Sequence, residues 1–304
     1  MIKKILIKFY QFFLLIIFLL FYPLLQVKYF LDWALSNIIY LRKGNHFFKN
    51  FLINKPFVKK IRFQDTNIKV LINSFYDVWR IGGYKNFFLN DLFDDAKKEK
   101  IYYYDIGANT GFSTIIASKK LSDRIESFAI ELEPANFKSL NDNILINKLK
   151  NISIINLGLS NETKSSRFFY NKINTIEKNF FYPLSSIGLH STKFSENLHN
   201  QNLSFNALML RFDDLVENFK LPQPTHIFID AFGSEKDIIS GMEKLLNSKS
   251  IKKIYLDVED ECNDVKDTWI FNNLSRKGFT PELTLEKKHK YAKNNWNIIF
   301  KKND

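Results

Sequence analysis

The sequence predicts an α/β protein with a mostly parallel sheet that is covered by helices on both faces. From residue 101 onward, short apolar runs alternate with helical segments, and this alternation favours parallel strands joined by helical crossovers. The first apolar run ends in the glycine-rich turn DIGANTG, residues 105–111. The chain closes with two strand-like runs that are expected to form an antiparallel hairpin at the edge of the sheet.

The expected elements follow one another in order along the chain. Strands are expected at 101–107, 126–134, 151–159, 225–233, 251–259, 280–288 and 295–302. Helices are expected at 112–121, 135–148, 234–248 and 267–278. Because strands and helices take turns, each of these helices is expected to cover one face of a single sheet.

We predict three regions along the chain. Residues 1–45 are expected to form hydrophobic, membrane-associating helices, and residues 46–100 a preamble of a hairpin and a helix. The hairpin is expected at 59–72, where two alternating runs flank a polar turn. Residues 101–304 then form the main domain, with a long and less regular insert at 160–225.

The composition limits the classes of partner. Apolar residues make up 45% of the chain and charged residues 25%, ordinary values for a globular protein with a core. The formal net charge of +12 comes mostly from scattered lysines without an arginine-rich tract, so nucleic acid is not expected as a partner. The single cysteine, Cys262, excludes an internal disulfide and a thiolate zinc cluster. The histidines lack metal-ligand spacing, so no metal is expected.

The N-terminus differs from the rest of the chain. Lys3, Lys4 and Lys8 precede an uncharged apolar run at 9–25, which has no polar face and therefore favours membrane attachment over a place in the core. The next segment, 28–44, carries apolar residues at helical spacing and fits an interfacial or hairpin-returning helix. No small-residue cleavage site follows, so a removed signal peptide is not expected. Membrane lipid is the partner expected for this region.

The glycine-rich turn is compared with three kinds of ligand loop. A phosphate loop requires Gly-x4-Gly-Lys-Ser/Thr, which is absent. A dinucleotide loop requires glycine where Asn109 and Phe112 stand. The remaining pattern, D-x-G-x-N-x-G, places a carboxylate at Asp105 and no side chain at Gly107 and Gly111, which leaves room for a ligand. An acid here suits a positively charged ligand such as S-adenosylmethionine, which carries an ammonium and a sulfonium and no phosphate.

An acid near the end of the second expected strand strengthens this interpretation. Glu133 lies 22 residues after Gly111, close to the spacing of about 20 residues expected for an acid that binds ribose hydroxyls. Glu131 lies on the same face of the strand and keeps a claim to this role. A solvated strand acid is the interpretation that we favour for Glu131.

An ordered set of motifs resembles the FkbM-type S-adenosylmethionine-dependent methyltransferases. The set covers about residues 70–301 and consists of YDIGANTGF, ELEPANFKSLNDNI, NISIINLGLS, LSSIGL, RFDDL, FIDAFGSEKDIISGMEKLL and NIIF. The resemblance implies a Rossmann-like class I methyltransferase fold with a mostly parallel seven-stranded sheet. It also implies methyl transfer, usually to a hydroxyl oxygen of a sugar or a natural product.

The same resemblance implies which residues bind the cofactor. They are Asp105, Gly107, Asn109, Gly111, Glu133, Asn136 and Ser160. The turn residues are expected beside the methionine part of the cofactor, Glu133 at the ribose and Ser160 beside the adenine. Asn136 follows Glu133 in the same motif.

Asp230 is the expected general base, because it ends a strand at the carboxyl edge of the sheet. Together with Gly233 and Glu235 it matches the Asp-x-Glu-Gly-x-Glu turn of the family. Phe232 stands where the family usually has the middle Glu, which puts any acid–base role of that position in doubt. This departure supports an alternative function, a catalytically degenerate, membrane-anchored module that acts as a partner in glycan assembly.

Other acids and histidines are weaker candidates. Asp213 and Asp214 match paired acids of the family, and they equally fit the cap of a following helix. His190 lies in the irregular insert, and His226 opens its strand at the end away from the expected chemistry.

The predicted function is O-methylation of a hydroxyl on a sugar, glycan or related metabolite at the membrane, with S-adenosylmethionine as cofactor. This cofactor is a cytosolic metabolite, so the catalytic domain is expected on the cytoplasmic side. A single span that follows a positive N-terminus would instead export that domain. We therefore expect a monotopic or hairpin anchor, and a small molecule or glycan as acceptor.

Overall fold

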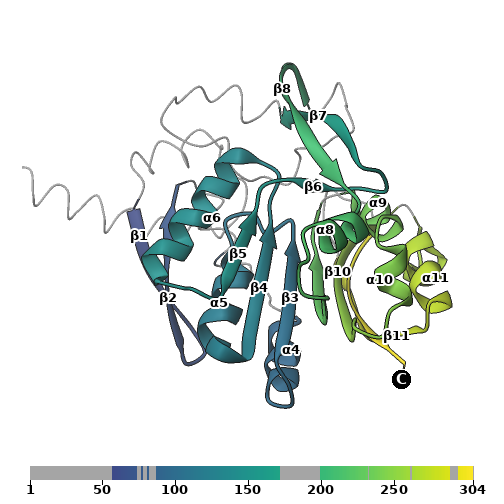
Figure 1. Cartoon of the computed structure of the whole chain (residues 1–304), viewed down its shortest axis with the longest axis horizontal. Coiled ribbons are helices and arrows are strands. Elements are labelled where there is room, and N and C mark those ends of the chain that lie inside the picture. The colour runs from purple at the N-terminus through teal and green to yellow at the C-terminus, as the bar shows by residue number, and fades with distance from the viewer. Residues whose placement is uncertain are drawn as a thin grey trace, which may run out of the picture. The chain divides into compact units, whose positions relative to one another are not determined.

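A seven-stranded sheet lies at the centre of the described structure (Figure 1). The computed structural model describes residues 57–73, 77, 81, 87–171, 199–231, 233–260, 262–287 and 294–303, all within the unit Lys55–Asp304. The strands of this sheet are β3 (Ile101–Ile106), β4 (Ile125–Ile130), β5 (Ile152–Ile155), β9 (His226–Ile229), β10 (Lys253–Asp260), β11 (Phe279–Lys287) and β12 (Asn294–Lys302). Their order across the sheet is β11-β12-β10-β9-β3-β4-β5.

Most of these strands are parallel. Strand β3 pairs in parallel with β4 and β9, and the same direction continues into β5 and β10. Strand β12 is antiparallel to β10, and β11 is antiparallel to β12. The prediction of a mostly parallel seven-stranded sheet with an antiparallel hairpin at the chain end is confirmed. The strand order reverses between β3 and β9, which is where open α/β sheets bind ligands.

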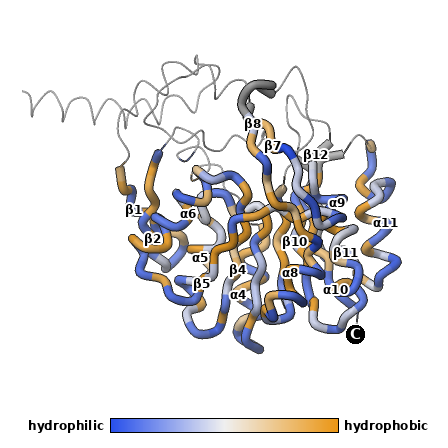
Figure 2. The backbone as a smooth tube through the Cα atoms, turned by 45° about the horizontal axis from the view of Figure 1, so that its top comes forward, coloured by the Kyte–Doolittle hydropathy of each residue, from blue (hydrophilic) through white to orange (hydrophobic). Residues whose placement is uncertain are grey.

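Alternate residues of the parallel strands face two layers of helices. One layer consists of α8 (Phe212–Asn218), α9 (Glu235–Ser240), α10 (Glu243–Asn247) and α11 (Trp269–Arg276), which share a buried cluster with Tyr104 and Leu256. On the other face, Phe88 precedes α4 (Leu89–Ala96) and stacks on Phe228 of β9, with ring centroids 4.4 Å apart. Because both faces are covered, the strands are hydrophobic along most of their length, as Figure 2 shows for β4 and β10.

The predicted hairpin is present and consists of β1 (Phe57–Phe63) and β2 (Thr66–Ile72). Its turn has two residues, and the first of them, Gln64, adopts a φ of 52°. A positive φ at this position is typical of two-residue hairpin turns. The side chains of Ile68, Val70 and Ile72 are buried, and β2 contacts α5 (Phe112–Leu121) and α6 (Pro134–Asn147).

Helix α6 binds β2 through buried asparagine side chains. Asn143 Oδ1 accepts a hydrogen bond from the Leu71 N–H at 2.7 Å. Asn147 accepts from the Lys69 N–H at 2.8 Å and donates to the Lys69 carbonyl at 2.6 Å. These amides satisfy backbone groups on the edge of β2 that faces away from β1. The hairpin is thus hydrogen-bonded to the main domain.

The insert contributes a separate three-stranded sheet in the order β6-β8-β7. These strands are β6 (Gly158–Leu159), β7 (Lys164–Asn171) and β8 (His199–Leu210). The expected strand 151–159 is divided, because its last two residues leave the large sheet and pair with β8. A β-carbon at Gly158 would lie 2.4 Å from Met209 Sδ, so a larger residue here would require the Met209 side chain to move.

The expected helix 234–248 is likewise divided, into α9 and α10, at Gly241. A β-carbon at Gly241 would lie 2.0 Å from the carbonyl oxygen of Ser160. The interruption therefore results from a close approach to another part of the backbone, which the pattern of apolar residues does not reveal.

Several predicted features lie outside the described residues. They are the apolar segments 9–25 and 28–44, the motif LSSIGL, His190 and Phe232. Within the part of the chain that the structure describes, no helix has both the length and the apolar character needed to cross a bilayer. The N-terminal hydrophobic helices and the domain boundaries stay predictions.

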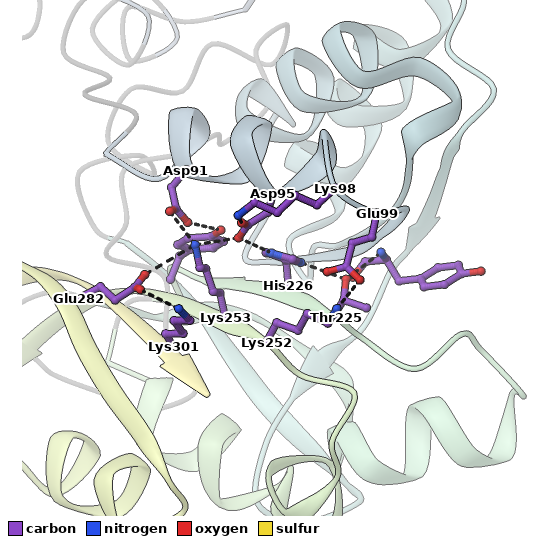
Figure 3. Close-up of polar contacts among 12 residues, drawn as sticks. Asp91, Asp95, Lys98, Glu99, Thr225, His226, Lys252, Lys253, Glu282 and Lys301 are labelled. Carbon is purple, nitrogen blue, oxygen red and sulfur yellow. Dashed lines mark hydrogen bonds and ion pairs between the residues drawn. The ribbon is translucent and has the colours of Figure 1, made fainter. Parts of the chain in front are cut away.

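A buried polar network closes the amino-terminal edge of the sheet (Figure 3). The Lys253 side chain is 9% exposed, and its Nζ lies 2.7 Å from Asp91 Oδ1 and 2.7 Å from Asp95 Oδ2. His226 is fully buried, with Nε2 3.3 Å from Asp95 Oδ2. Although burial opposes ionisation, hydrogen bonds from His226 and Lys253 hold the pKa of Asp95 well below its usual range. The network fixes α4 against the first residues of β9 and β10.

Replacing Lys253 with Met should lower the free energy of unfolding by about 2–4 kcal/mol, because the Asp91 and Asp95 carboxylates then lose their shared cation. The matched control is Lys252→Met. Lys252 pairs with Glu99 at an exposed position, so its loss should lower stability by at most about 1 kcal/mol. Urea denaturation measures both values, and equal losses would show that the network contributes no more than a surface ion pair.

Candidate functional site

The ends of β3 and β9 meet at the carboxyl edge of the sheet, where the strand order reverses. Asp230 follows β9 directly, and its N–H donates to the carbonyl oxygen of Ile106 at 3.0 Å. A β-carbon at Gly107 would lie only 2.2 Å from the carbonyl oxygen of Asp230. The structure therefore brings the glycine-rich turn and the expected base into direct contact.

Alternate residues of the turn have positive φ. The values are 83° at Gly107, 55° at Asn109 and 80° at Gly111. Asn109 adopts a left-handed conformation, which asparagine tolerates better than most residues. A β-carbon at Gly111 would lie 2.3 Å from Leu140 Cδ1, in addition to the clash at Gly107. The protein itself fills the space where a β-carbon of either glycine would lie, so contacts within the fold are one reason for glycine here. The binding of a ligand by these two residues stays a prediction.

The Asp105 carboxyl is fully buried behind the turn. Its Oδ2 accepts hydrogen bonds from the hydroxyl of Ser113, at 2.6 Å, and from that of Thr114, both in the first turn of α5. Burial raises the pKa of this carboxyl against the opposing effect of these hydroxyls. Its Oδ1 makes no direct hydrogen bond to a described residue. The Tyr103 hydroxyl lowers the pKa of the Asp105 carboxyl, as the hydroxyls of Ser113 and Thr114 do. Asp105 thus fixes the start of α5 and keeps one oxygen available as an acceptor.

Glu131 joins the turn to the end of β4. Its Oε2 accepts from the Asn109 N–H at 2.8 Å, and its Oε1 accepts from the Glu133 N–H at 2.9 Å. The Nδ2 atom of Asn136 lies 3.4 Å from the same Oε1. Because Glu131 is only 7% exposed, its interpretation as a solvated strand acid is wrong. Sequence spacing alone did not separate the two glutamates, since both lie near the expected distance from the turn.

Glu133 serves the helix that follows it. Its carboxylate accepts from the Asn136 N–H at 2.6 Å and caps the start of α6. The Oδ1 atom of Asn136 is buried and has no hydrogen-bond partner among the described residues. The ribose-binding role of Glu133 stays a prediction. Its carboxylate already accepts the hydrogen bond that caps α6.

Two asparagines that the sequence did not single out, buried Asn143 and exposed Asn156, support the turn and the strand end beside it. Asn143 Nδ2 donates to the Thr110 carbonyl at 2.8 Å, while its Oδ1 binds β2. Asn156 Nδ2 donates to the Glu131 carbonyl at 2.7 Å. A signal for the first was available in the helical spacing of the polar residues that α6 buries, namely Asn136, Ser139, Asn143 and Asn147.

Ser160 lies where β6 meets β8. Its N–H donates to the Leu210 carbonyl at 2.9 Å, and its hydroxyl donates to Asn161 Oδ1 at 3.1 Å. Among the residues that the structure describes, no hydrogen bond joins Ser160 to the glycine-rich turn. Its place beside an adenine stays a prediction.

Asp213 is a buried structural acid. Its two carboxylate oxygens accept from the N–H groups of Lys244, at 2.9 Å, and Leu245, at 3.0 Å. Asp213 therefore caps α10. The sequence suggested instead that it caps α8, the helix to which Asp213 belongs. Asp214 accepts a hydrogen bond from the Thr163 hydroxyl at 2.7 Å on the surface.

Glu235 is a second acid at the carboxyl edge whose ionisation is disfavoured. It is 4% exposed, and its Oε1 accepts from the N–H groups of Ala231, at 3.2 Å, and Gly233, at 3.1 Å. Burial, followed by the charges of Asp230 and Asp257, raises the pKa of Glu235 from 4.5 to about 8. Asp230 itself is exposed. The edge beside the turn is therefore a region of mutually repelling carboxylates.

The remaining candidates lie elsewhere. His226 is at the amino-terminal edge, opposite the turn, as its place at the start of a strand predicted. Across the described ranges, no three His, Cys, Asp or Glu side chains are grouped so that they could hold a metal.

Glu235→Gln should flatten the pH dependence of stability. The folded protein holds the Glu235 proton more tightly than the unfolded chain does, so this group stabilises the fold fully below pH 4.5 and loses that effect as pH rises to about 8. Gln keeps an oxygen for the Ala231 and Gly233 amides but cannot ionise. Urea denaturation across this range should show a smaller fall in unfolding free energy for Glu235→Gln than for the native protein or for the exposed control Glu217→Gln. An unchanged slope would contradict the assignment.

The comparison with family models finds one match. The model described as the methyltransferase FkbM domain matches residues 105–277, more than half of the chain. This range contains both ends of the site, from Asp105 to Glu235. No curated protein matches the chain.

Solved structures of low sequence identity are similar to this chain. Precorrin-6y C5,15-methyltransferase from Geobacter metallireducens is 15% identical, with 67% of this chain and 81% of that chain covered and a TM-score of 0.37. M. capricolum TrmK in complex with S-adenosyl-homocysteine is 13% identical, with coverages of 71% and 68% and a TM-score of 0.40. Aeropyrum pernix fibrillarin is 10% identical, with coverages of 66% and 66% and a TM-score of 0.39. The family match does not depend on these likenesses, and by that match the chain belongs to the FkbM methyltransferase family.

Proposed function

We propose that this protein transfers a methyl group from S-adenosylmethionine to a hydroxyl oxygen of a sugar, glycan or related metabolite at a membrane, with its catalytic domain on the cytoplasmic side. The observation that carries the proposal is the contact between the glycine-rich turn and Asp230 at the switch point of the sheet. The contact joins backbone atoms, and it supports the interpretation of the turn as a cofactor loop that neighbours a candidate base.

The residues around the turn fit this cofactor. Asp105 Oδ1 and Asn136 Oδ1 are buried acceptors without a hydrogen-bond partner among the described residues, and the cofactor carries ammonium, hydroxyl and amino donors. Burial raises the pKa values of Asp105 and Glu235, and a cationic ligand bound beside them would favour their charged forms.

Glu131 is better placed than Glu133 to bind the ribose. Both oxygens of Glu131 accept one backbone N–H each, and Oε1 also lies 3.4 Å from Asn136 Nδ2. Its hydrogen bond to Asn109 also holds it beside the turn. One carboxylate oxygen of Glu133 instead accepts the hydrogen bond that caps α6.

The chemistry divides between positioning and proton transfer. Bound S-adenosylmethionine supplies a methyl group on a sulfonium, which is a good leaving group. The chain then has to orient an acceptor hydroxyl and remove its proton, and Asp230 is the exposed carboxylate beside the turn that can take it. A positioned base of this kind contributes about 10²–10⁴-fold to the rate.

Glu131→Gln should weaken binding of S-adenosylhomocysteine by about tenfold or more, because a hydrogen bond to a charged group contributes about 1.5–3 kcal/mol. Glu133→Gln is the matched control, since Gln retains the oxygen that caps α6, and its effect should be smaller. Calorimetric titration measures both. A larger loss in Glu133→Gln would return the ribose role to Glu133.

Asp230→Asn should lower the methyl-transfer rate by about 10²–10⁴-fold and leave the affinity for S-adenosylhomocysteine close to that of the native protein. The exposed residue Asp123 precedes β4 at the opposite edge of the sheet, so Asp123→Asn is the control. The assay follows labelled methyl transfer from S-adenosylmethionine into membrane glycans and lipids extracted from cells that lack this protein.

The same assay separates the enzyme from a catalytically degenerate module. A native protein that binds S-adenosylhomocysteine but labels no fraction would favour the degenerate module. A native protein that binds neither form of the cofactor would refute the assignment of the turn.

A further inference from the structure

The outward face of the β1–β2 hairpin carries cations and no acid. In the antiparallel register, its three cross-strand pairs are Val58–Leu71, Lys60–Lys69 and Arg62–Asn67. Because side chains alternate between the faces of a strand, these six residues lie opposite the face that buries Ile68, Val70 and Ile72. We call this set of six residues the hairpin face.

The positive charge of the hairpin face is not neutralised by the described part of the protein. Lys60 and Lys69 are exposed and stand directly opposite each other, an arrangement that is destabilising in an isolated hairpin. Neither of them, nor Arg62, forms an ion pair with a described residue. The one acid of the hairpin, Asp65, lies in the turn and pairs with Lys120 of α5 at 2.6 Å.

Exposed apolar side chains accompany these cations. On the hairpin face, Val58 is 49% exposed at the beginning of β1 and stands opposite the partly exposed Leu71. Lysines on an edge strand also protect it from pairing with other chains. Protection of the edge does not explain a cation at Lys69 of β2, or the exposed Val58. Cations together with apolar side chains are what an anionic bilayer surface binds.

The place of the hairpin in the molecule suits such a contact. Strands β1 and β2 lie outside α5 and α6, at the end of the large sheet away from β11 and β12 (Figure 1). In the sequence, β1 follows the segment that contains the apolar run 9–25. A second, electrostatic contact would add to that anchor, because stable membrane binding usually takes two signals.

We propose that the hairpin face docks on the surface of a membrane that contains anionic lipid. This inference rests on the proposed function in one respect, the location of the enzyme at a membrane. The docked hairpin is hydrogen-bonded through Asn143 to the carbonyl of Thr110, so it holds the glycine-rich turn in a fixed relation to the bilayer that carries the acceptor.

The test uses the full-length protein and cosedimentation with two kinds of vesicle, phosphatidylcholine alone and phosphatidylcholine mixed with phosphatidylglycerol. The native protein should bind the mixed vesicles more tightly. The combined variant Lys60→Gln, Arg62→Gln, Lys69→Gln should lose about ten- to hundredfold of that binding and keep its binding to neutral vesicles. The matched control, Lys249→Gln, Lys266→Gln, Arg276→Gln, removes the same charge from exposed positions on the opposite side and should retain the preference.

Three results would overturn the proposal. They are a native protein without preference for anionic vesicles, an equal loss in the control variant, and tighter binding to a mixed-sequence DNA duplex that the hairpin variant loses. Calorimetric titration with S-adenosylhomocysteine on the same samples separates this proposal from the proposed function. Intact cofactor binding with failed docking refutes the docking alone, whereas absent cofactor binding in the native protein refutes the methyltransferase assignment alone.

Discussion

The carbonyl oxygen of Asp230 occupies the space that a side chain at Gly107 would take, and this contact determines the layout of the site. Two parallel strands, β3 and β9, must end at the same height for it to form, and the hydrogen bond from Asp230 N–H to Ile106 fixes that height. The turn after β3 then has to leave the sheet with positive φ at alternate residues. The pattern D-x-G-x-N-x-G follows from this geometry, because glycine and asparagine adopt such conformations most easily.

Two buried side chains form hydrogen bonds to the turn from opposite sides. Glu131 binds the Asn109 N–H from the β4 side, and Asn143 binds the Thr110 carbonyl from the α6 side. Since Asn143 also binds Leu71 of β2, the hairpin supports the turn through one side chain. A segment that reads as a preamble in the sequence is therefore part of the support of the site, and its loss would remove the Leu71 N–H that Asn143 Oδ1 binds.

The sequence predicts the parallel sheet well, because strands buried on both faces leave long apolar runs such as IYYYDI between recognisable helices. It predicts poorly wherever two distant parts of the backbone meet. Gly158 and Gly241 divide a strand and a helix that look continuous, since each lies against a neighbour that no local pattern reveals. The choice between Glu131 and Glu133 stays a prediction for a related reason. Both fit the spacing, and the pattern does not reveal that Glu133 also caps α6.

The pKa values of buried carboxyls shift in opposite directions at the two edges of the sheet. At the amino-terminal edge, Lys253 and His226 surround Asp95 and hold its pKa low. At the carboxyl edge, burial raises the pKa values of Asp105 and Glu235, and neither forms an ion pair with a residue that the structure describes. At the edge where open α/β sheets bind ligands, burial thus favours the neutral forms of these two acids. A cation bound beside the turn would favour their charged forms instead and so lower both pKa values.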